Sequence, residues 1–300
     1  MRIVSVEPFL TELVCSFGLG GNLVGVSHQC DLPKEFASTS RVTSAPKADT
    51  AGKLSSFDLD IAKIKSLGPE LILSRVPADD DPIPAIKRAS SEIKSLLGES
   101  VVFRSYNPVT LDGVFDFLAE LGRHLKVPQK GTDLASRLKA QAMDWGDNFY
   151  ERTKNKRVTI LSSISPFRLA GYWVPDLIHL ASAVSQMPSN GKQQAEVTWD
   201  EIKAFKPDVI IVAPEGQDLA TVLKTFPILE RLPDWEEVPA VKRGEVTFTD
   251  GLHNFYHPSS DLFDTLAILF SSIAGFESGY ITKRDSFHRL RWLELHRHRV

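Results

Sequence analysis

Cysteine is scarce in this sequence: 300 residues include only two, Cys15 and Cys30, and they form no Cys-x-x-Cys pair. A disulfide scaffold is therefore excluded, and whether the two thiols pair stays open. Long apolar runs are also lacking, because none approaches the roughly 20 residues that a membrane span needs. An excess of positive charge is missing too, since the net charge is −3. A generally basic surface for nucleic acid is not expected.

The N-terminus lacks the marks of a secretory signal. It reads Met-Arg-Ile-Val-Ser-Val-Glu-Pro, without a charged n-region, an apolar h-region or a small-residue cleavage site. We therefore expect a cytoplasmic protein. A periplasmic or membrane-associated protein is the alternative if the N-terminus was trimmed.

Signatures of enzymes are sparse as well. No Gly-x-Gly-x-x-Gly opens a helix, and neither a Walker-type Gly-Lys-Ser/Thr nor a Gly-x-Ser-x-Gly elbow occurs. The motif from His28 to Asp31 is compatible with a metal corner or a Cys/His pair, but such short clusters are more often structural. His253 and His257 have the spacing of a helical metal site, but neighbouring Gly and Pro residues place them in a loop. We expect no catalytic residue, no metal site and no cofactor.

What the sequence does contain is an alternation of strand and helix patterns. The β-rich runs are residues 2–6, 23–27, 71–74, 101–105, 158–163, 209–213 and 246–249. The helical patterns are residues 11–17, 59–67, 83–97, 111–125, 174–183, 199–205, 219–226 and 260–273. This alternation predicts an α/β protein with largely parallel sheets.

An internal repeat divides the chain. The segment from Ile64 to Leu73 resembles the segment from Ile202 to Ile211 at a constant offset of 138 residues. Each copy is a helix end, a Pro that stops it, an acidic residue and a buried strand. The repeat predicts one similar α/β unit in each half. Coincidence is the alternative, because helix–Pro–strand is a common join.

Between the halves, residues 131–156 have the pattern of one amphipathic helix of roughly 20 residues, or about 30 Å. We therefore predict an N-terminal α/β lobe (1–126), a connecting helix (127–156), a C-terminal α/β lobe (157–275) and a basic tail (276–300). Two lobes joined by a stiff helix leave a cleft between them. The tail is interpreted either as a solvated helix that packs one apolar stripe on the body or as an interaction segment.

The candidate ligand-binding residues follow from a rule for open α/β sheets, in which ligands bind outside the carboxyl ends of the strands. The loops at these ends are rich in aromatic residues and single polar groups, which suits a large, flat, partly apolar ligand. The predicted ligand-binding residues are Glu7, His28, Arg75, Tyr172, Trp173, Gln217, Phe255, Tyr256 and His257.

Several segments together resemble a known family. The opening Arg-Ile-Val-Ser-Val-Glu-Pro-Phe-Leu-Thr-Glu and the run Leu-Val-Gly-Val-Ser-His-Gln-Cys-Asp-Leu-Pro are similar to class III periplasmic-type substrate-binding proteins, the iron-siderophore and vitamin B12 binders. Residues 57–74 and 197–213 resemble the two helix–Pro–strand units of that family. Residues 171–181 and 241–250 are closer to a cobalamin-binding-like branch that often lacks signal peptides.

The resemblance implies two Rossmann-like lobes joined by a backbone helix, ligand capture in the cleft between them and delivery to an ABC importer. We therefore predict a non-catalytic, monomeric binding protein for a small molecule, a corrinoid or a siderophore-like metal chelate, with no nucleic-acid partner. An intracellular enzyme that uses His28, Cys30 or His257 in the same cleft is the first alternative. A scaffold that acts through its basic tail is the second.

Overall fold

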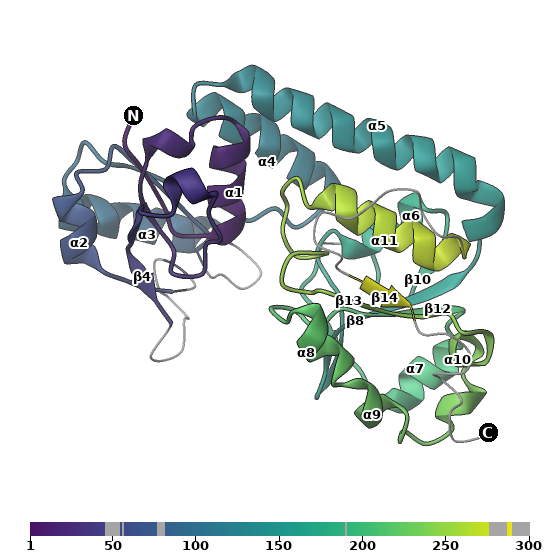
Figure 1. The fold of residues 1–300 in the computed structure, drawn as a ribbon. Coiled ribbons are helices and arrows are strands. Elements are labelled where there is room, and N and C mark those ends of the chain that lie inside the picture. Colours follow the sequence, from purple (N-terminus) through teal and green to yellow (C-terminus); the bar gives the residue numbers. More distant parts are fainter. Residues whose placement is uncertain (46–54, 56, 77–81, 190, 276–286, 290–300) are drawn as a thin grey trace. The chain divides into compact units, whose positions relative to one another are not determined.

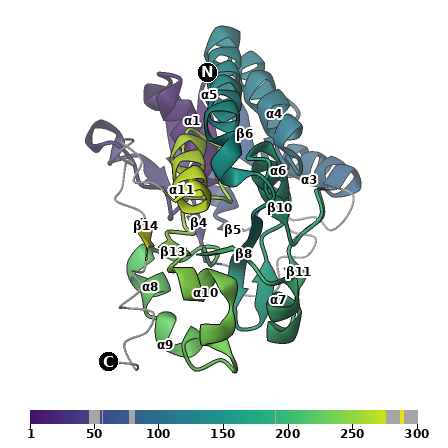
Figure 2. The same ribbon diagram turned by 90° about the vertical axis from the view of Figure 1, so that its right-hand side faces the viewer.

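The structure is a computed structural model that describes residues 1–45, 55, 57–76, 82–189, 191–275 and 287–289. The chain divides into two compact units. The N-terminal unit consists of residues 1–107 and 117–132, and the C-terminal unit consists of residues 108–116 and 133–300. Each unit is an α/β structure with its own sheet (Figures 1 and 2), so the predicted fold class is confirmed. The lobe boundaries drawn from the sequence stay predictions.

The sheet of the N-terminal unit has five strands in the order β3-β2-β1-β6-β7, and every neighbouring pair is parallel. A separate two-stranded antiparallel sheet joins β4 to β5. The strands are β1 (Ile3–Ser5), β2 (Leu23–Val26), β3 (Ser40–Arg41), β4 (Thr43–Ser44), β5 (Asp58–Leu59), β6 (Leu71–Ser74) and β7 (Val102–Ser105). The helices that begin in this part of the chain are α1 (Pro8–Ser16), α2 (Ile61–Ser66) and α3 (Pro82–Leu97), with short 3₁₀ turns at Gly20–Asn22 and Lys34–Phe36.

The sheet of the C-terminal unit has the order β11-β9-β8-β12-β13-β14, and β10 also pairs with β8. Strands β10, β8, β12 and β13 are parallel to one another. β9 is antiparallel to β8, β11 is antiparallel to β9, and β14 is antiparallel to β13. The strands are β8 (Arg157–Ile164), β9 (Phe167–Leu169), β10 (Val184–Ser185), β11 (Ala195–Glu196), β12 (Val209–Val212), β13 (Val246–Thr249) and β14 (Phe287–Arg289).

Helices cover both faces of this second sheet. In Figures 1 and 2, α6 and α11 lie on one face, and α7, α8, α9 and α10 lie on the other. These helices are α6 (Val174–Leu180), α7 (Trp199–Phe205), α8 (Leu219–Leu223), α9 (Phe226–Leu229), α10 (Pro239–Arg243) and α11 (Leu262–Ala274), with a 3₁₀ turn at Trp235–Glu237. The apolar core between the second group and the sheet includes Ile202, Trp235 and Phe248, all buried. The central strand β12 is accordingly apolar along its whole length, and β13 beside it is buried throughout.

The predicted repeat corresponds to two equivalent pieces of structure. α2 leads through Pro69 into β6, and α7 leads through Pro207 into β12. β6 lies between β1 and β7, and β12 lies between β8 and β13, so each copy supplies a central strand. Ile64 and Ile202, at matching positions of the repeat, are both fully buried in the core of their own unit.

The acidic residue of each copy has the same partner. Glu70 accepts a hydrogen bond from the backbone amide of Arg2 at 2.6 Å, and Asp208 accepts one from the backbone amide of Arg157 at 2.8 Å. Arg2 immediately precedes β1 and Arg157 begins β8, the strands that pair with β6 and β12. The acid after the Pro therefore fixes the start of the neighbouring strand, which explains why both copies carry one.

Two long helices, α4 (Leu111–His124) and α5 (Pro128–Thr153), follow β7. The predicted amphipathic helix at 131–156 corresponds to α5, which has 26 residues and begins earlier. Gly131, the first residue of the predicted helix, lies inside α5. A Cβ at Gly131 would stand 2.2 Å from the carbonyl oxygen of Leu118 and 3.1 Å from the Cα of Gly122. Glycine is needed there for the close approach of α4 and α5.

Two local predictions are corrected by the structure, and three short strands were not predicted. The helix expected at 219–226 is two short helices, because Pro227 starts a new one, α9. The hairpin strand β9 and the edge strands β10 and β11 are too short for a periodic signal. In the basic tail, Phe287–Arg289 form β14, an antiparallel strand on β13, and not a helix. The rest of the tail lies outside the described residues.

Across the part of the chain that the structure describes, no helix combines the length and apolar character needed to cross a membrane.

Candidate functional site

The carboxyl ends of the parallel strands in the N-terminal unit share one feature. Ser5, Ser74 and Ser105 are the last residues of β1, β6 and β7, and Ser27 follows β2 directly. Ser5, Ser27 and Ser74 are fully buried. Small hydroxyl side chains therefore cover the sheet edge at which ligands of α/β proteins bind.

A hydrogen-bonded network lies at the carboxyl ends of β1 and β2. Thr11 in α1 donates to the hydroxyl of Ser5 at 2.8 Å, and the Cys30 thiol donates to Thr11 at 3.2 Å. Nearby, the His28 backbone amide and its ring Nδ1 lie 3.0 and 2.7 Å from the hydroxyl oxygen of Thr43. The His28 ring also packs edge-on against Phe57, with centroids 5.1 Å apart. His28 is thus held in one orientation, half-buried, beside the strand end.

Two charged candidates from the same unit occupy different positions. Glu7 is buried at the start of α1 and accepts a hydrogen bond from the Ser55 hydroxyl at 3.4 Å. Arg75 is half-buried directly after β6. Beside it, the Val76 amide donates to Ser105, and the Asn107 side chain donates to the Val76 carbonyl at 2.9 Å. These bonds fix the loop that carries Arg75.

Cys30 has the properties of a structural thiol. Burial raises the pKa of Cys30 to about 11, and this effect outweighs the hydrogen bond with Thr11, which lowers it. A thiol with such a pKa is protonated at neutral pH, and a protonated thiol is a poor nucleophile. Cys15 is likewise a free thiol, which answers the question that the sequence left open. The protonated Cys30 therefore does not support the alternative of an enzyme that uses this thiol as its nucleophile.

In the C-terminal unit, the loops after β12 and β13 are bound to each other through their backbones. The Gly216 amide donates to the carbonyl of Gly251, and the amides of Gly251 and Leu252 both donate to the carbonyl of Gln217, each at 3.0 Å. A Cβ at Gly251 would stand 2.1 Å from the carbonyl oxygen of Pro214. This close approach, which only glycine allows, makes the two loops one rigid cluster.

Within this cluster, the sequence pattern pointed to His253 and His257, but the structure pairs His253 with Asp250. Oδ2 of Asp250 lies 2.6 Å from Nδ1 of His253. Oδ1 of Asp250 accepts from the amides of Leu252 at 2.7 Å and His253 at 3.2 Å. The ring of His257 is perpendicular to that of His253, with centroids 6.3 Å apart. An Asp–x–x–His spacing in a turn was the signal that sequence reasoning missed.

The predicted aromatic candidates are mostly buried. Phe255 and Tyr256 belong to the core, and the Tyr256 hydroxyl donates to the carbonyl of Ala213 at 2.7 Å. Burial raises the pKa of Tyr256 well above its usual value. Trp173 is buried at the start of α6, where the half-buried Tyr172 ring stacks on it at 6.1 Å. The strand-end rule selects loops but does not say which way a side chain points.

The remaining candidates, Gln217 and His257, are half-buried in the loop cluster. Every predicted residue therefore lies in or beside the expected loops of its own unit. Whether these residues contact a ligand stays a prediction. Within the described ranges, no group of three or more His, Cys, Asp or Glu residues is arranged to hold a metal ion.

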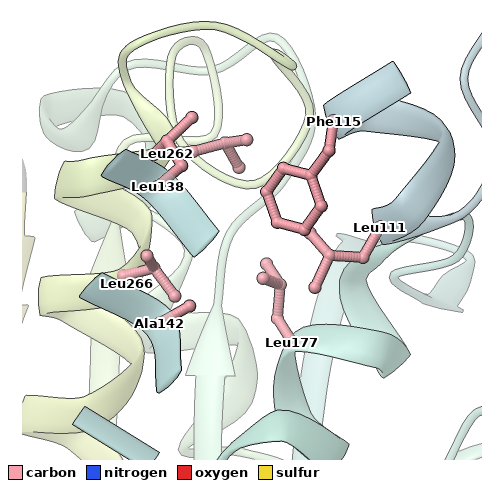
Figure 3. Close-up of a pocket in the computed structure, with 7 residues that line it drawn as sticks. All are labelled: Leu111, Phe115, Leu138, Ala142, Leu177, Leu262 and Leu266. Atoms are coloured by element: carbon pink, nitrogen blue, oxygen red, sulfur yellow. The ribbon is translucent and has the colours of Figure 1, made fainter. Parts of the chain in front are cut away.

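A small apolar pocket lies elsewhere in the C-terminal unit, between four helices (Figure 3). Its lining residues are Leu111, Phe115, Leu138, Ala142, Leu177, Leu262 and Leu266. Its free volume of about 10 Å³ barely equals what one water molecule needs. The pocket is a packing gap between α4, α5, α6 and α11 and not a ligand site.

Comparison with known proteins identifies the class. The model of the family described as periplasmic binding protein matches residues 3–251, so the chain belongs to that family. The vitamin B12-binding protein of Vibrio cholerae serotype O1 is 23% identical over 221 residues, covering 71% of this chain and 70% of that protein.

Two solved structures show the same fold. An ABC transporter substrate-binding protein from Listeria monocytogenes has a TM-score of 0.69 at 18% identity, covering 92% of this chain and 99% of its own. A periplasmic heme-binding protein from Pseudomonas aeruginosa has a TM-score of 0.67 at 18% identity, covering 97% of this chain and 98% of its own.

The family confirms the resemblance seen in the sequence and gives the chain a substrate-binding role. The relatives are named as binding proteins and not as enzymes, in agreement with the protonated Cys30. The expectation of a cytoplasmic protein is wrong, because the matching family is that of periplasmic binding proteins.

Proposed function

We propose that this chain is the substrate-binding protein of an ABC importer and that it captures a corrinoid or a related metal chelate. The importer part of the proposal is supported by a solved relative named as an ABC transporter substrate-binding protein. The ligand class is supported by relatives named for vitamin B12 and heme, which are both large, flat metal macrocycles.

One observation within the chain carries the proposal: hydrogen bonds within the protein hold the strand-end loops of both units in place. In the N-terminal unit the hydroxyl network fixes His28, and in the C-terminal unit backbone hydrogen bonds fix the segment from Gly251 to Leu252. Rigid loops bind with a smaller loss of conformational entropy, which is the property that a capture protein needs. Polar groups on such loops also reject ligands that leave them unpaired.

The proposal is tested by thermal unfolding of the intact protein with cyanocobalamin, hemin and a ferric hydroxamate siderophore, each added separately. Binding stabilises the folded state by RT ln(1 + [L]/Kd), or about 2.7 kcal/mol at a hundredfold excess over Kd. We expect at least one chelate to raise the melting temperature in proportion to the logarithm of its concentration. If none of the three does so, the proposed ligand class is wrong.

Recovery of the ligand separates binding from turnover. The chelate extracted after incubation should have an unchanged mass, for the wild type and for Cys30→Ser alike. A Ser side chain can keep the hydrogen bond to Thr11, so Cys30→Ser leaves the fold intact while removing the thiol. A chemically altered ligand that is seen with the wild type and absent with Cys30→Ser would contradict a pure binding role.

A further inference from the structure

We propose that His253 is an axial nitrogen ligand to the metal of a flat chelate and that Asp250 is its positioning residue. This inference rests on the proposed function and deepens it. It selects, among metal chelates, those whose metal has an exchangeable axial position.

The geometry of the pair carries the first step. Oδ1 of Asp250 is occupied by the amides of Leu252 and His253, so the carboxylate cannot rotate away. Its other oxygen, Oδ2, lies 2.6 Å from Nδ1 of His253. An ionised carboxylate can only accept, so Nδ1 must carry the proton. In the neutral imidazole, Nε2 then has its lone pair available.

The surroundings of Nε2 give the second step. The His253 side chain is 25% exposed, and among the described residues no hydrogen bond to Nε2 is formed. Asp250, by contrast, is buried, and the neighbouring Asn254 and Phe255 are anchored by Thr249 and Thr265. The ring is thus presented to the surface of the unit from a backbone that cannot easily move.

Ligand chemistry gives the third step. Histidines that ligate metals in proteins characteristically donate their other ring nitrogen to a carboxylate, which fixes the tautomer and raises the basicity of the ligating nitrogen. Here the pair stands after β13, at the strand end where ligands of this type of sheet bind. With a ferric or cobalt(III) macrocycle, Nε2 forms a bond to the metal and one water leaves. No electron or proton is transferred.

The absorption spectrum of the bound metal provides the test. Hemin and aquacobalamin are titrated separately into the wild type, His253→Ala, Asp250→Asn and the control His179→Ala, which removes an exposed histidine from α6. Quenching of tryptophan fluorescence measures binding independently of the spectrum. The wild type and His179→Ala should give the spectrum of a nitrogen-ligated metal with at least one of the two macrocycles. His253→Ala should bind more weakly than the wild type, by at least the factor expected for Asp250→Asn, and should lose that spectrum, and added imidazole should restore the spectrum.

Asp250→Asn tests the positioning role. It should weaken binding about 10- to 100-fold, the usual effect of removing such a partner of a metal ligand. A nitrogen-ligated spectrum that persists in His253→Ala, or that is lost in His257→Ala instead, overturns the assignment while the binding function stands. Binding of the ferric hydroxamate alone also overturns it, because that metal has no open position. Absence of binding by every chelate overturns the proposed function itself.

Discussion

Gly251→Ala is the substitution that most directly perturbs the loop cluster of the C-terminal unit. The new Cβ would stand 2.1 Å from the carbonyl oxygen of Pro214 and 2.7 Å from its carbonyl carbon, both backbone atoms that cannot rotate away. The loop after β13 must therefore separate from the loop after β12. Overpacking of this kind costs about 1–3 kcal/mol. The three backbone hydrogen bonds between the loops, at about 0.5–1.5 kcal/mol each, are weakened as well.

Together these effects predict that Gly251→Ala lowers the free energy of unfolding of the C-terminal unit by about 2–5 kcal/mol. Urea unfolding followed by tryptophan fluorescence is the assay. All tryptophans within the described residues belong to this unit, namely Trp145, Trp173, Trp199 and Trp235.

Gly216→Ala is the matched control from the same cluster. No atom lies within 4 Å of its added Cβ, so its cost comes only from its φ of +75°. That cost is about 1–2 kcal/mol. If Gly251→Ala unfolds at the urea concentration of the wild type, or is more stable than Gly216→Ala, the rigid-cluster argument is refuted.

Two further predictions concern the repeat. Ile64→Ala and Ile202→Ala should each lower the free energy of unfolding of their own unit by about 2–5 kcal/mol. Tryptophan fluorescence should register this loss only for Ile202→Ala. An unfolding transition that shifts equally for both variants would contradict separate cores. For Asp208, burial acts to raise the pKa, but hydrogen bonds from Arg157 and Arg243 outweigh it and hold the pKa below its usual value. Asp208→Asn should therefore lose about 1.5–3 kcal/mol at neutral pH, and this difference should disappear as acid protonates the wild-type carboxylate below its lowered pKa. Urea midpoints measured from pH 7 down to pH 3 check the sign, and a difference that grows on acidification would contradict it.

The sequence predicted the parts of the fold that repeat a simple physical pattern. β6, α7 and β13 begin and end where the sequence placed them. β6 is a short apolar run, β13 alternates apolar residues with threonine, and the helix face formed by Ile202 and Phe205 in α7 ends just before Pro207. The short strands β9 to β11 could not be predicted. They contain two or three residues each, and their pairing is decided by tertiary contacts, with β8 for β9 and β10 and with β9 for β11, and not by local sequence.

The candidate site shows where sequence reasoning ends. Strand-end positions located the loops of Trp173 and Tyr256, but both side chains are buried, because a large ring next to a Pro-bounded helix or loop lowers its free energy most by packing in the core. The orientation of His253 depends on its bond with Asp250, and that bond depends on a turn. A pattern of residue types does not reveal such a turn, whereas the backbone geometry does.

Native mass spectrometry after incubation with equimolar cyanocobalamin, hemin and ferric siderophore tests the central claim most directly, because it shows in one spectrum whether the chain retains a chelate and whether that chelate is intact. We expect one unchanged chelate bound to the folded protein, with the same result for Cys30→Ser. A spectrum of protein without any chelate, or of protein with a ligand altered in mass, would contradict the account of this chain as a capture protein for metal chelates.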